Sequence, residues 1–324
     1  MKGSPPSVLV TGVNGFVGSA LCRELAAIDV PFVAASRLGG SSQMAGLIDF
    51  RIDQLDADTD WRGALVANGV VVHLAARVHV LNEDSSEAEN LYYETNVAAT
   101  LNLARQAAAA GVKRFIFVSS VKVNGEGQNA PFTESDRPSP VDGYARSKWE
   151  AEKGLSEIAA SSKMELVILR LPLVYGPGVK ANFLRLISLV DRGVPLPFDG
   201  VQNRRSMIFL GNAVDAILTS LTAPGAKDHT FFLSDREDVS TPDLIRRLAI
   251  ELGRPARLFY VPQALIELVG KITGRSEEID RLLGTLCVDS NLIARTLGWR
   301  PPYSMQHGIA ATVSWYLSLR GRGS

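Results

Sequence analysis

The chain has 324 residues, of which 46% are hydrophobic and 21% are charged, a composition typical of a globular protein and not of a disordered or fibrous one. Its 34 basic and 34 acidic residues cancel, so the overall charge does not favour nucleic acid or an anionic membrane as a partner. The two cysteines and four histidines are scattered and no apolar run resembles a leader or a membrane span, so we expect a cytoplasmic protein without a disulfide framework or a metal.

The N-terminal segment predicts a strand, a glycine-rich turn and a helix. Residues 7–10 are mostly β-branched or apolar, three glycines follow at a spacing of three, and residues 19–28 have the pattern of an amphipathic helix. Gly12 permits a tight turn, Gly15 lets the backbone approach a pyrophosphate, and Gly18 lets the helix pack closely on the strand. The helix N-terminus would then face the phosphates. The G-x-x-G-x-x-G spacing differs from the usual G-x-G-x-x-G fingerprint, and the alternative is an ordinary turn between strand and helix.

Short apolar strands alternate with helices through the first half of the chain. This alternation predicts an α/β fold with a doubly wound parallel sheet. The predicted strands are residues 31–37, 47–52, 70–74, 114–118 and 166–170, and the predicted helices are residues 61–67, 87–110 and 142–160.

The chain becomes richer in glycine and proline after Pro172. We expect a dinucleotide-binding domain over residues 1–171 and a smaller substrate-binding domain over residues 172–324, with residues 208–222 returning to the first domain. A ligand would then bind in the crevice at the carboxyl ends of the strands. Short apolar pieces of the second domain alternate with helices, which are predicted over residues 183–192, 212–221, 241–252 and 262–268.

Tyr144 and Lys148 are four residues apart in a predicted helix and therefore share one of its faces. An ammonium beside a phenol favours the phenolate, so we expect Lys148 to lower the pKa of Tyr144 and to ease proton exchange near neutral pH. Ser119 and Ser120 end the preceding predicted strand, where a hydroxyl can hydrogen-bond the oxygen that Tyr144 protonates. Separately, the pair fits a solvated helix face and the serines fit a turn, but together with the glycine turn they favour an active site.

Four motifs together resemble one family of enzymes. They are the G-x-x-G-x-x-G turn, His73-Leu74-Ala75-Ala76, Ser119-Ser120 before the Val-Asn-Gly of residues 123–125, and Tyr144-x-x-x-Lys148. The set is similar to the extended short-chain dehydrogenase/reductases, above all to the NAD-dependent epimerases, dehydratases and reductases of nucleotide sugars. The segments at residues 170–178, 205–210 and 297–301 also fit that family, so the resemblance covers nearly the whole chain.

The resemblance implies a role for each matching residue. Tyr144 would be the catalytic acid and base, Lys148 would hold the nicotinamide ribose and adjust the tyrosine, and Ser120 would orient the reacting oxygen. The implied cofactor-binding positions are Gly12, Asn14, Gly15, Phe16, Val17, Gly18, Ser36, Arg37, Asp53, Leu74, Ala75, Ala76, Asn96, Ser119, Tyr144, Lys148 and Leu171. The implied substrate-binding positions are Ser120, Val121, Lys122, Tyr144, Asn182, Arg281 and, as the best candidate for contact with the substrate diphosphate, Arg205.

Two departures from the family pattern bear on the reaction and on the cofactor. Family dehydratases carry an Asp-Glu pair after the strand-end hydroxyl as acid and base, whereas this chain has Val121 and Lys122, which argues against a 4,6-dehydratase. Many NAD-dependent relatives end the second strand in an aspartate that binds ribose hydroxyls, whereas this chain has Ser36 and Arg37. Serine and arginine suit a 2′-phosphate, so the sequence favours NADP over NAD, unless Arg37 is simply a solvated side chain.

Residues 119–126 resemble a branch of the family that includes reductases of 4-keto-6-deoxy sugars, such as those that make UDP-N-acetylquinovosamine for bacterial surface polysaccharides. We therefore expect reduction of a UDP-4-keto-6-deoxy-N-acetylhexosamine at carbon 4. The alternatives are a 4-epimerase of UDP-glucose or UDP-N-acetylglucosamine and, more distantly, an NAD(P)-sensing protein without turnover. The same resemblance implies a homodimer that pairs the helices at residues 87–110 and 142–160.

Overall fold

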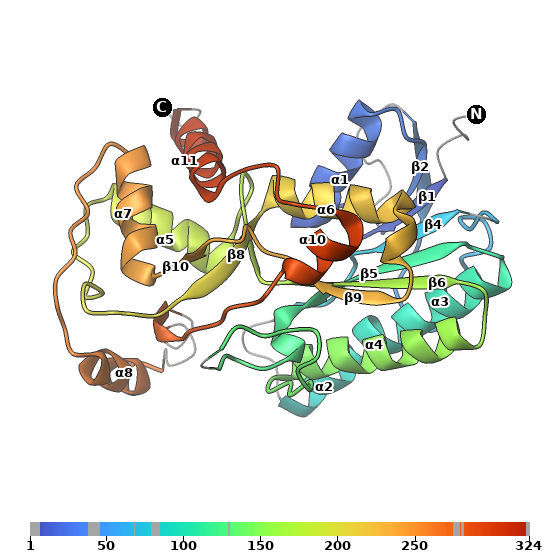
Figure 1. The fold of residues 1–324 in the computed structure, drawn as a ribbon, viewed down its shortest axis with the longest axis horizontal. Helices are drawn as coiled ribbons and strands as arrows, with labels where there is room; N and C mark the ends of the chain where they lie inside the picture. The colour runs from blue at the N-terminus through green and yellow to red at the C-terminus, as the bar shows by residue number, and fades with distance from the viewer. Residues whose placement is uncertain are drawn as a thin grey trace.

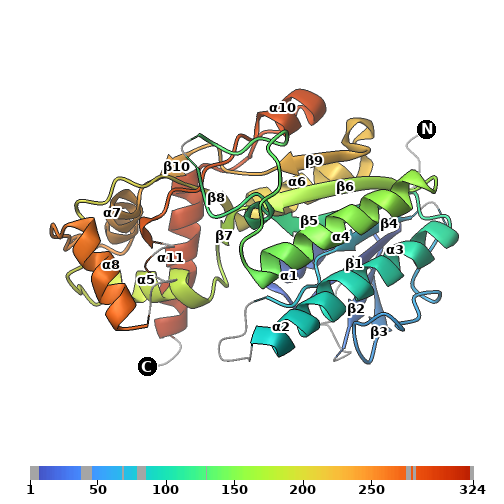
Figure 2. The ribbon, with the colours of Figure 1, turned by 90° about the horizontal axis from the view of Figure 1, so that it is seen from below.

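A computed structural model describes residues 7–37, 46–67, 69–78, 85–128, 130–274, 279 and 282–321. Two regions lie side by side in it. A large sheet with helices on both faces is on the right of Figure 1, and a smaller sheet surrounded by helices is on the left. The turned view in Figure 2 keeps the two regions apart in the same way, so the molecule is elongated along the line that joins them.

The large sheet, as far as the chain is described, has seven parallel strands: β1 (Val8–Thr11), β2 (Phe32–Ser36), β3 (Leu47–Arg51), β4 (Val70–His73), β5 (Arg114–Ser120), β6 (Glu165–Leu171) and β9 (His229–Phe232). Their order is β3-β2-β1-β4-β5-β6-β9. The direction of winding reverses between β1 and β4, and such a switch point is where open α/β sheets bind their ligands. The predicted doubly wound parallel sheet is confirmed.

Helices cover both faces of the large sheet in separate layers. Because successive residues of a strand point to opposite faces, Val8 and Val10 enter one hydrophobic core and Leu9 enters the other. The first core lies under α1 (Phe16–Ala27) and α6 (Leu210–Thr222), and the second lies under α3 (Ala99–Ala109) and α4 (Gly143–Ala160), with α2 (Ser85–Tyr92) and a π-helical segment (Tyr93–Ala98) leading into α3.

The smaller region has a three-stranded sheet and a hydrophobic core of its own. Phe16 packs against this core and also against the core under α1, so it lies where the two regions meet. The strands are β7 (Leu173–Tyr175), β8 (Arg205–Phe209), parallel to β7, and β10 (Asp238–Val239), antiparallel to β8. The helices are α5 (Ala181–Asp191), α7 (Thr241–Glu251), α8 (Gln263–Ile272) and α11 (Met305–Gly321).

Segments from beyond Pro172 complete the large sheet. Helix α6 packs along α1, β9 pairs with the outer edge of β6, and α10 (Asn291–Leu297) contacts β9. The sequence predicts a return to the first domain only over residues 208–222, so β9 and α10 are additional returning segments. The division of the chain into domains near residue 171 stays a prediction.

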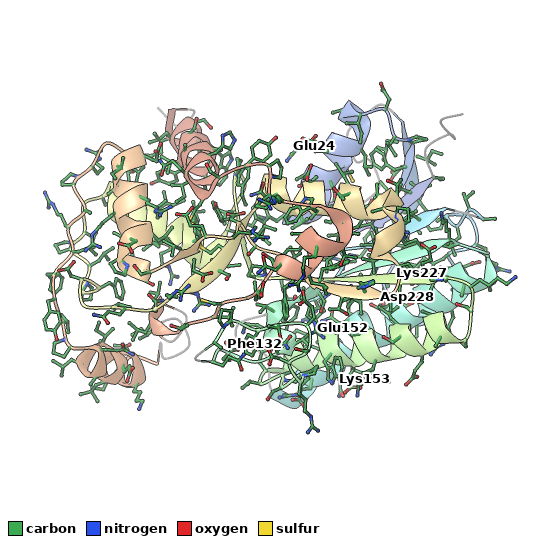
Figure 3. All side chains as sticks on the ribbon, viewed as in Figure 1. Glu24, Phe132, Glu152, Lys153, Lys227 and Asp228 are labelled. Atoms are coloured by element: carbon green, nitrogen blue, oxygen red, sulfur yellow. The ribbon has the colours of Figure 1, made fainter. Side chains whose placement is uncertain are left out.

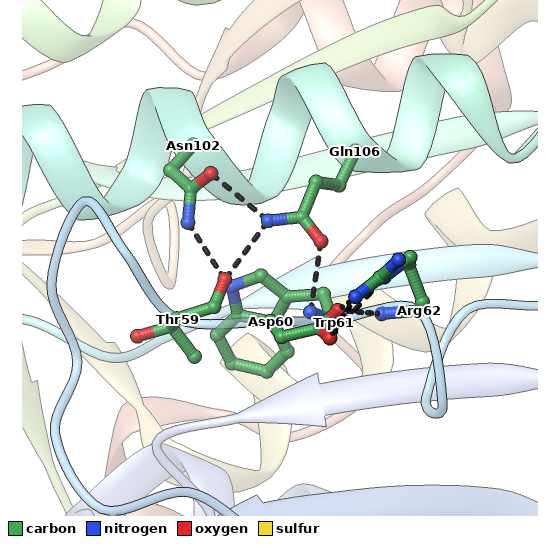
Figure 4. Close-up of polar contacts among 6 residues, drawn as sticks. All are labelled: Thr59, Asp60, Trp61, Arg62, Asn102 and Gln106. Atoms are coloured by element: carbon green, nitrogen blue, oxygen red, sulfur yellow. Dashed lines mark hydrogen bonds and ion pairs between the residues drawn. The ribbon is translucent and has the colours of Figure 1, made fainter.

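The helix predicted over residues 61–67 is wrong, because this segment forms turns. Figure 4 shows the reason: side-chain amides on α3 bind the backbone just before and within the segment. Asn102 and Gln106 each donate to the carbonyl oxygen of Thr59 at 2.8 Å, and the Gln106 amide oxygen accepts from the backbone N–H of Trp61 at 2.8 Å. These bonds hold the chain so that the Trp61 ring is fully buried, and they compete with a helical path.

Within the described ranges, the helices are all too short or too polar to span a bilayer, and no cluster of histidine, cysteine, aspartate or glutamate is arranged to hold a metal ion. Cys22 and Cys287 are free and buried. Burial raises the pKa of each thiol to about 11.

Candidate active site

The glycine turn after β1 has no room for side chains. Gly12 has a φ of +73°, and a Cβ there would lie 2.6 Å from the backbone nitrogen of Ala75. A Cβ at Gly18 would lie 2.1 Å from the carbonyl oxygen of Gly12, and the N–H of Gly15 donates to that same oxygen at 2.9 Å. The N-terminus of α1 therefore opens onto bare backbone, with Asn14 exposed at the turn. This surface fits the pyrophosphate of a dinucleotide.

The residues predicted near the adenosine lie at neighbouring strand ends. Ser36 is the buried last residue of β2, and its carbonyl oxygen accepts a hydrogen bond from the N–H of Ile52 at 3.0 Å. Arg37 directly follows β2, Asp53 lies two residues after β3, and both are exposed. Since β2 is the neighbour of β1, these ends share one edge of the sheet with the glycine turn. Their contacts with a cofactor stay predictions.

His73, at the end of β4, connects two strands and a helix. Its Nδ1 lies 2.7 Å from the Thr11 hydroxyl, its Nε2 lies 2.9 Å from the Thr100 hydroxyl, and its ring stacks on Phe117 at 5.9 Å. Burial, with a smaller contribution from the charge of Lys148, lowers the pKa of His73 to about 3. His73 is therefore neutral at physiological pH and fixes the loop of Leu74, Ala75 and Ala76 that follows it.

Asn96 holds the same loop from the π-helical segment. Its amide oxygen accepts from the N–H of Arg77 at 2.7 Å, and its amide nitrogen donates to the carbonyl of Arg77 at 3.0 Å and to the Ser147 hydroxyl at 2.9 Å. The side chain is almost fully buried. Asn96 thus joins the strand-end loop to α4, and such π-helical insertions are frequent at functional sites.

The two serines that end β5 have different surroundings, because neighbouring residues of a strand point in opposite directions. The Ser119 hydroxyl is buried and donates to Glu152 Oε1 at 2.5 Å. Ser120 pairs with Leu171 across the sheet and caps a short 3₁₀ turn, where its oxygen accepts from the N–H of Lys122 at 3.2 Å. Since that bond uses the Ser120 oxygen as an acceptor, its O–H can still donate to a ligand.

Lys148 extends from α4 to the end of β5. Its Nζ donates to the carbonyl oxygen of Val118 at 2.9 Å and lies 4.5 Å from the centre of the Phe117 ring. Burial lowers the pKa of Lys148 to about 8. Tyr144 lies one turn earlier on the helix, with its ring edge-on to Tyr92 at 6.5 Å.

The prediction that the pKa of Tyr144 is lowered is wrong in this structure. Burial raises the pKa of Tyr144, and the negative charge of Asp142 and then Tyr92 raise it further. The ammonium of Lys148 donates to the carbonyl oxygen of Val118, and burial with the nearby negative groups outweighs any lowering of the pKa of Tyr144 by that ammonium. The phenol of Tyr144 is therefore protonated in the chain alone, which is the form that donates a proton.

A buried network behind the site was not predicted. Arg170 of β6 binds Glu152 of α4 through its Nε at 3.1 Å and its Nη2 at 2.5 Å, and it also donates to Asn124 at 2.8 Å. Figure 3 shows Glu152 on the side of α4 that faces the sheet, whereas the adjacent Lys153 lies at the outer surface. The available signal was an acidic residue one helical turn after Lys148, on the same inward face.

The two residues in the dehydratase positions have structural partners. Val121 is almost fully buried in a small core. The ammonium of Lys122 lies 2.7 Å from Asp142 Oδ2 and 3.0 Å from Glu126 Oε1. Their contacts with substrate stay predictions, and each side chain already packs or pairs within the protein.

The predicted substrate residues of the smaller region are spread out. Asn182 is exposed in the first turn of α5, directly after Ala181, whose φ of +52° is uncommon for a residue other than glycine. Arg205 begins β8, and its Nη1 donates to the carbonyl oxygen of Gly284 at 3.0 Å. Arg281 lies outside the described residues. Gly178 approaches Phe16 of α1, so this region does reach the glycine turn.

Comparisons with known proteins agree with this arrangement. The model of the "NAD dependent epimerase/dehydratase family" matches residues 8–233. A UDP-glucose 4-epimerase of Vibrio cholerae is 44% identical over 98% of both chains. An N-acetyl-alpha-D-glucosaminyl-diphospho-ditrans,octacis-undecaprenol 4-epimerase of Escherichia coli O157:H7 is 26% identical over 95% of both. The solved structure of MoeE5 in complex with UDP-glucose and NAD has a TM-score of 0.78 at 25% identity, covering 98% of this chain and 100% of that one.

Proposed function

The chain belongs to the NAD dependent epimerase/dehydratase family, and on that premise we propose that it is a 4-epimerase of a UDP-linked hexose. The observation that carries the proposal is the 44% identity, over 98% of both chains, to a relative named as a UDP-glucose 4-epimerase. The surroundings of Val121 and Lys122 support it, because neither position supplies a carboxylate for the elimination of water that a 4,6-dehydratase performs.

The residues around the switch point suit a nicotinamide dinucleotide. The glycine turn leaves a space that a Cβ at Gly12 or Gly18 would fill, and Lys148 extends to the adjacent strand end, where its ammonium can bind ribose hydroxyls. When bound, the nicotinamide would accept the hydride of carbon 4 and return it. The chain's own residues must then bind the sugar and move the hydroxyl proton.

Tyr144 would take the proton of the 4-hydroxyl and later return it. Burial favours the neutral phenol, so Tyr144 readily donates its proton to the sugar oxygen. To take a proton from the 4-hydroxyl, Tyr144 must first be a phenolate, and this form needs positive charge nearby. Lys148, on the same face of α4, would contribute to that charge. Ser120 would donate a hydrogen bond to the sugar oxygen, because its own oxygen already accepts from the N–H of Lys122.

A second candidate is the reaction that the sequence favours, the reduction of a UDP-4-keto-6-deoxy-N-acetylhexosamine to the 4-hydroxy sugar. Arg37 supports it, since an exposed guanidinium at the end of β2 suits the 2′-phosphate of NADPH. A reductase consumes its reduced cofactor, whereas an epimerase returns the hydride and keeps NAD. NAD is bound in the MoeE5 structure. For this chain, NADP is the cofactor that would accompany the reductase reaction.

One experiment separates the two reactions. Purified protein is incubated with UDP-glucose or UDP-N-acetylglucosamine and NAD, and the product is tested for the galacto epimer. In parallel, UDP-4-keto-6-deoxy-N-acetylglucosamine is added with NADPH or NADH, and the absorbance of the reduced cofactor is followed. The galacto epimer without net cofactor consumption supports the epimerase. Stoichiometric loss of reduced cofactor with the keto sugar alone contradicts it and favours the reductase.

We further propose that two chains form a homodimer through α3 and α4. The support is their position together on one outer face of the large sheet, seen in Figure 2. Sedimentation velocity over a range of protein concentrations tests this, and a monomer throughout would contradict it.

A further inference from the structure

Lys122 links two parts of the candidate site. Its backbone N–H donates to the Ser120 oxygen at 3.2 Å, and its ammonium lies 2.7 Å from Asp142 Oδ2. The other oxygen of Asp142 accepts from the N–H of Ala145 at 2.6 Å and so caps α4. One ion pair therefore ties the turn that follows Ser120 to the helical turn that carries Tyr144.

We propose that Lys122 is a positioning residue that acts through Asp142 and does not bind the substrate itself. The ion pair holds the first turn of α4 against the end of β5, and the ammonium offsets a carboxylate that would otherwise repel negative charge on the Tyr144 oxygen. The inference rests on the proposed function only in taking Tyr144 as the proton carrier.

Electrostatics in the site supports this role. Asp142 is the first of the charged groups that raise the pKa of Tyr144, after burial. Lys122 and Asp142 are 22% and 24% exposed, so solvent screens this pair less than a pair at the open surface. A cation 2.7 Å from the carboxylate reduces its effect on the phenol, and loss of that cation should make Tyr144 harder to deprotonate.

The other charged groups near Lys122 and Asp142 pair elsewhere or are more exposed. Arg146, one turn along α4, pairs outward with Glu89 at 2.5 Å and not with the site. Glu126 is a second partner of Lys122 and is 49% exposed, so it contributes a weaker attraction. The titratable groups that surround Tyr144 and Asp142 are Lys148 and Arg146 on α4, Tyr92 and Glu89 on α2, and Lys122 and Glu126 at the turn after β5.

The test is a double-mutant cycle of Lys122→Met and Asp142→Asn. Asparagine also caps helices, so Asp142→Asn removes the charge and can keep the bond to Ala145. The first readout is the pH profile of kcat. The second is the tyrosinate absorbance of the NAD-loaded protein, with each variant corrected by its Tyr144→Phe counterpart. Arg146→Met is the matched control, because it removes a cation from the same end of α4.

We expect Lys122→Met to raise the pKa of Tyr144 by about 0.5–1 pH unit. At pH values below that pKa, kcat should fall about three- to tenfold, because less Tyr144 is deprotonated. Asp142→Asn should move the titration downward by a similar amount. In the Asp142→Asn background, Lys122→Met should cause a smaller shift, because the carboxylate that holds the ammonium at this end of α4 is then missing. Lys122→Arg should restore the profile, and Arg146→Met should leave it in place.

Three results would overturn the proposal. A Lys122→Met shift that is undiminished in the Asp142→Asn background would show that the ammonium acts independently of the carboxylate. A rise in KM for the UDP-sugar without a change in the pH profile would make Lys122 a substrate contact. If Lys122→Met shifts the titration of Tyr144 in neither readout, Lys122 has no role at Tyr144. If the wild-type protein turns over no UDP-sugar, the proposed function fails, and the tyrosinate absorbance still decides the role of Lys122.

Discussion

Two of the ion pairs that join α4 to neighbouring segments differ in burial. In the middle of the helix, Glu152 binds Arg170 of β6 at 2.5 Å, with the side chains 2% and 5% exposed. At the N-terminal end, Asp142 binds Lys122 at 2.7 Å, with the side chains 24% and 22% exposed. The distances are nearly equal, so burial is the main difference between the pairs.

Burial decides what each pair can do. When a fully buried ion pair loses one member, the remaining charge cannot be hydrated, so Arg170 and Glu152 are committed to holding the fold. Glu152 is further fixed by the Ser119 hydroxyl. A partly exposed pair can lose one member to water at smaller cost, so Lys122 and Asp142 can adjust the charge near Tyr144 while contributing less to stability.

Breaking the buried pair has the largest expected effect. Arg170→Met leaves the Glu152 carboxylate in the interior without its guanidinium, and such a loss costs about 3–5 kcal/mol of unfolding free energy. Urea titration measures it. Adding Glu152→Gln should recover part of the loss, because no charge then remains buried. A loss below about 1 kcal/mol would mean that water reaches the carboxylate and that burial does not distinguish the two pairs.

The glycine turn after β1 extends the comparison of the two ion pairs, because lack of space and not charge limits which residues fit there. Gly18→Ala would place a Cβ 2.1 Å from the Gly12 carbonyl oxygen, so the turn must move. We expect NAD affinity to fall about tenfold or more, or about 1.4 kcal/mol, in a calorimetric titration. Gly63→Ala is the control, since its Cβ would meet only the Phe50 ring, at 3.2 Å. Equal losses in the two variants would contradict the role of the turn.

A buried group without charge gives a pH test. The folded chain keeps His73 neutral because burial lowers its pKa from 6.5 to about 3, whereas the unfolded chain protonates it below about pH 6.5. The free energy of unfolding should therefore fall as the pH drops below about 6.5, approaching about 1.4 kcal/mol per unit, until about pH 3. Urea titrations of the wild type and of His73→Gln between about pH 5 and pH 6.5 check this. The slope from His73 should vanish in the variant, and identical slopes would count against a neutral His73.

The smallest effect on stability is expected at the partly exposed pair, Lys122 and Asp142. Lys122→Met should change the unfolding free energy by less than about 1 kcal/mol, although it moves the titration of Tyr144. The same urea titration used for Arg170→Met provides the measurement. A loss as large as that of Arg170→Met would erase the distinction between the two pairs.

The parts of the fold that the sequence predicts are those whose pattern is local. The turn between β1 and α1 needs glycines at fixed spacing, and β4 and β5 are apolar runs with clear ends, so neighbouring residues reveal them. The helix expected at residues 61–67 does not form, because amides on α3 bind its backbone from far along the chain. The return of β9 to the large sheet likewise depends on a distant strand edge that no local pattern specifies.

The site divides in the same way. Tyr144, Lys148 and Ser120 can be found from helical spacing and from a strand end. The direction in which the pKa of Tyr144 shifts could not be predicted from the sequence. It depends on burial and on the nearby charge of Asp142, and both arise only when the chain folds. The bond between Glu152 and Arg170 was missed for the same reason, since the two residues lie on separate elements.

The position of β9 has a consequence for synthesis on the ribosome. As the nascent chain emerges, β6 must wait for residues 229–232 before its outer edge is paired. The face of α1 that packs against α6 is also uncovered until residues 210–222 have been made. A gene fragment that stops at residue 171 would expose both surfaces and would be prone to aggregate. The large sheet is therefore completed only after β7 and β8 of the smaller region have been made, and the two regions mature together.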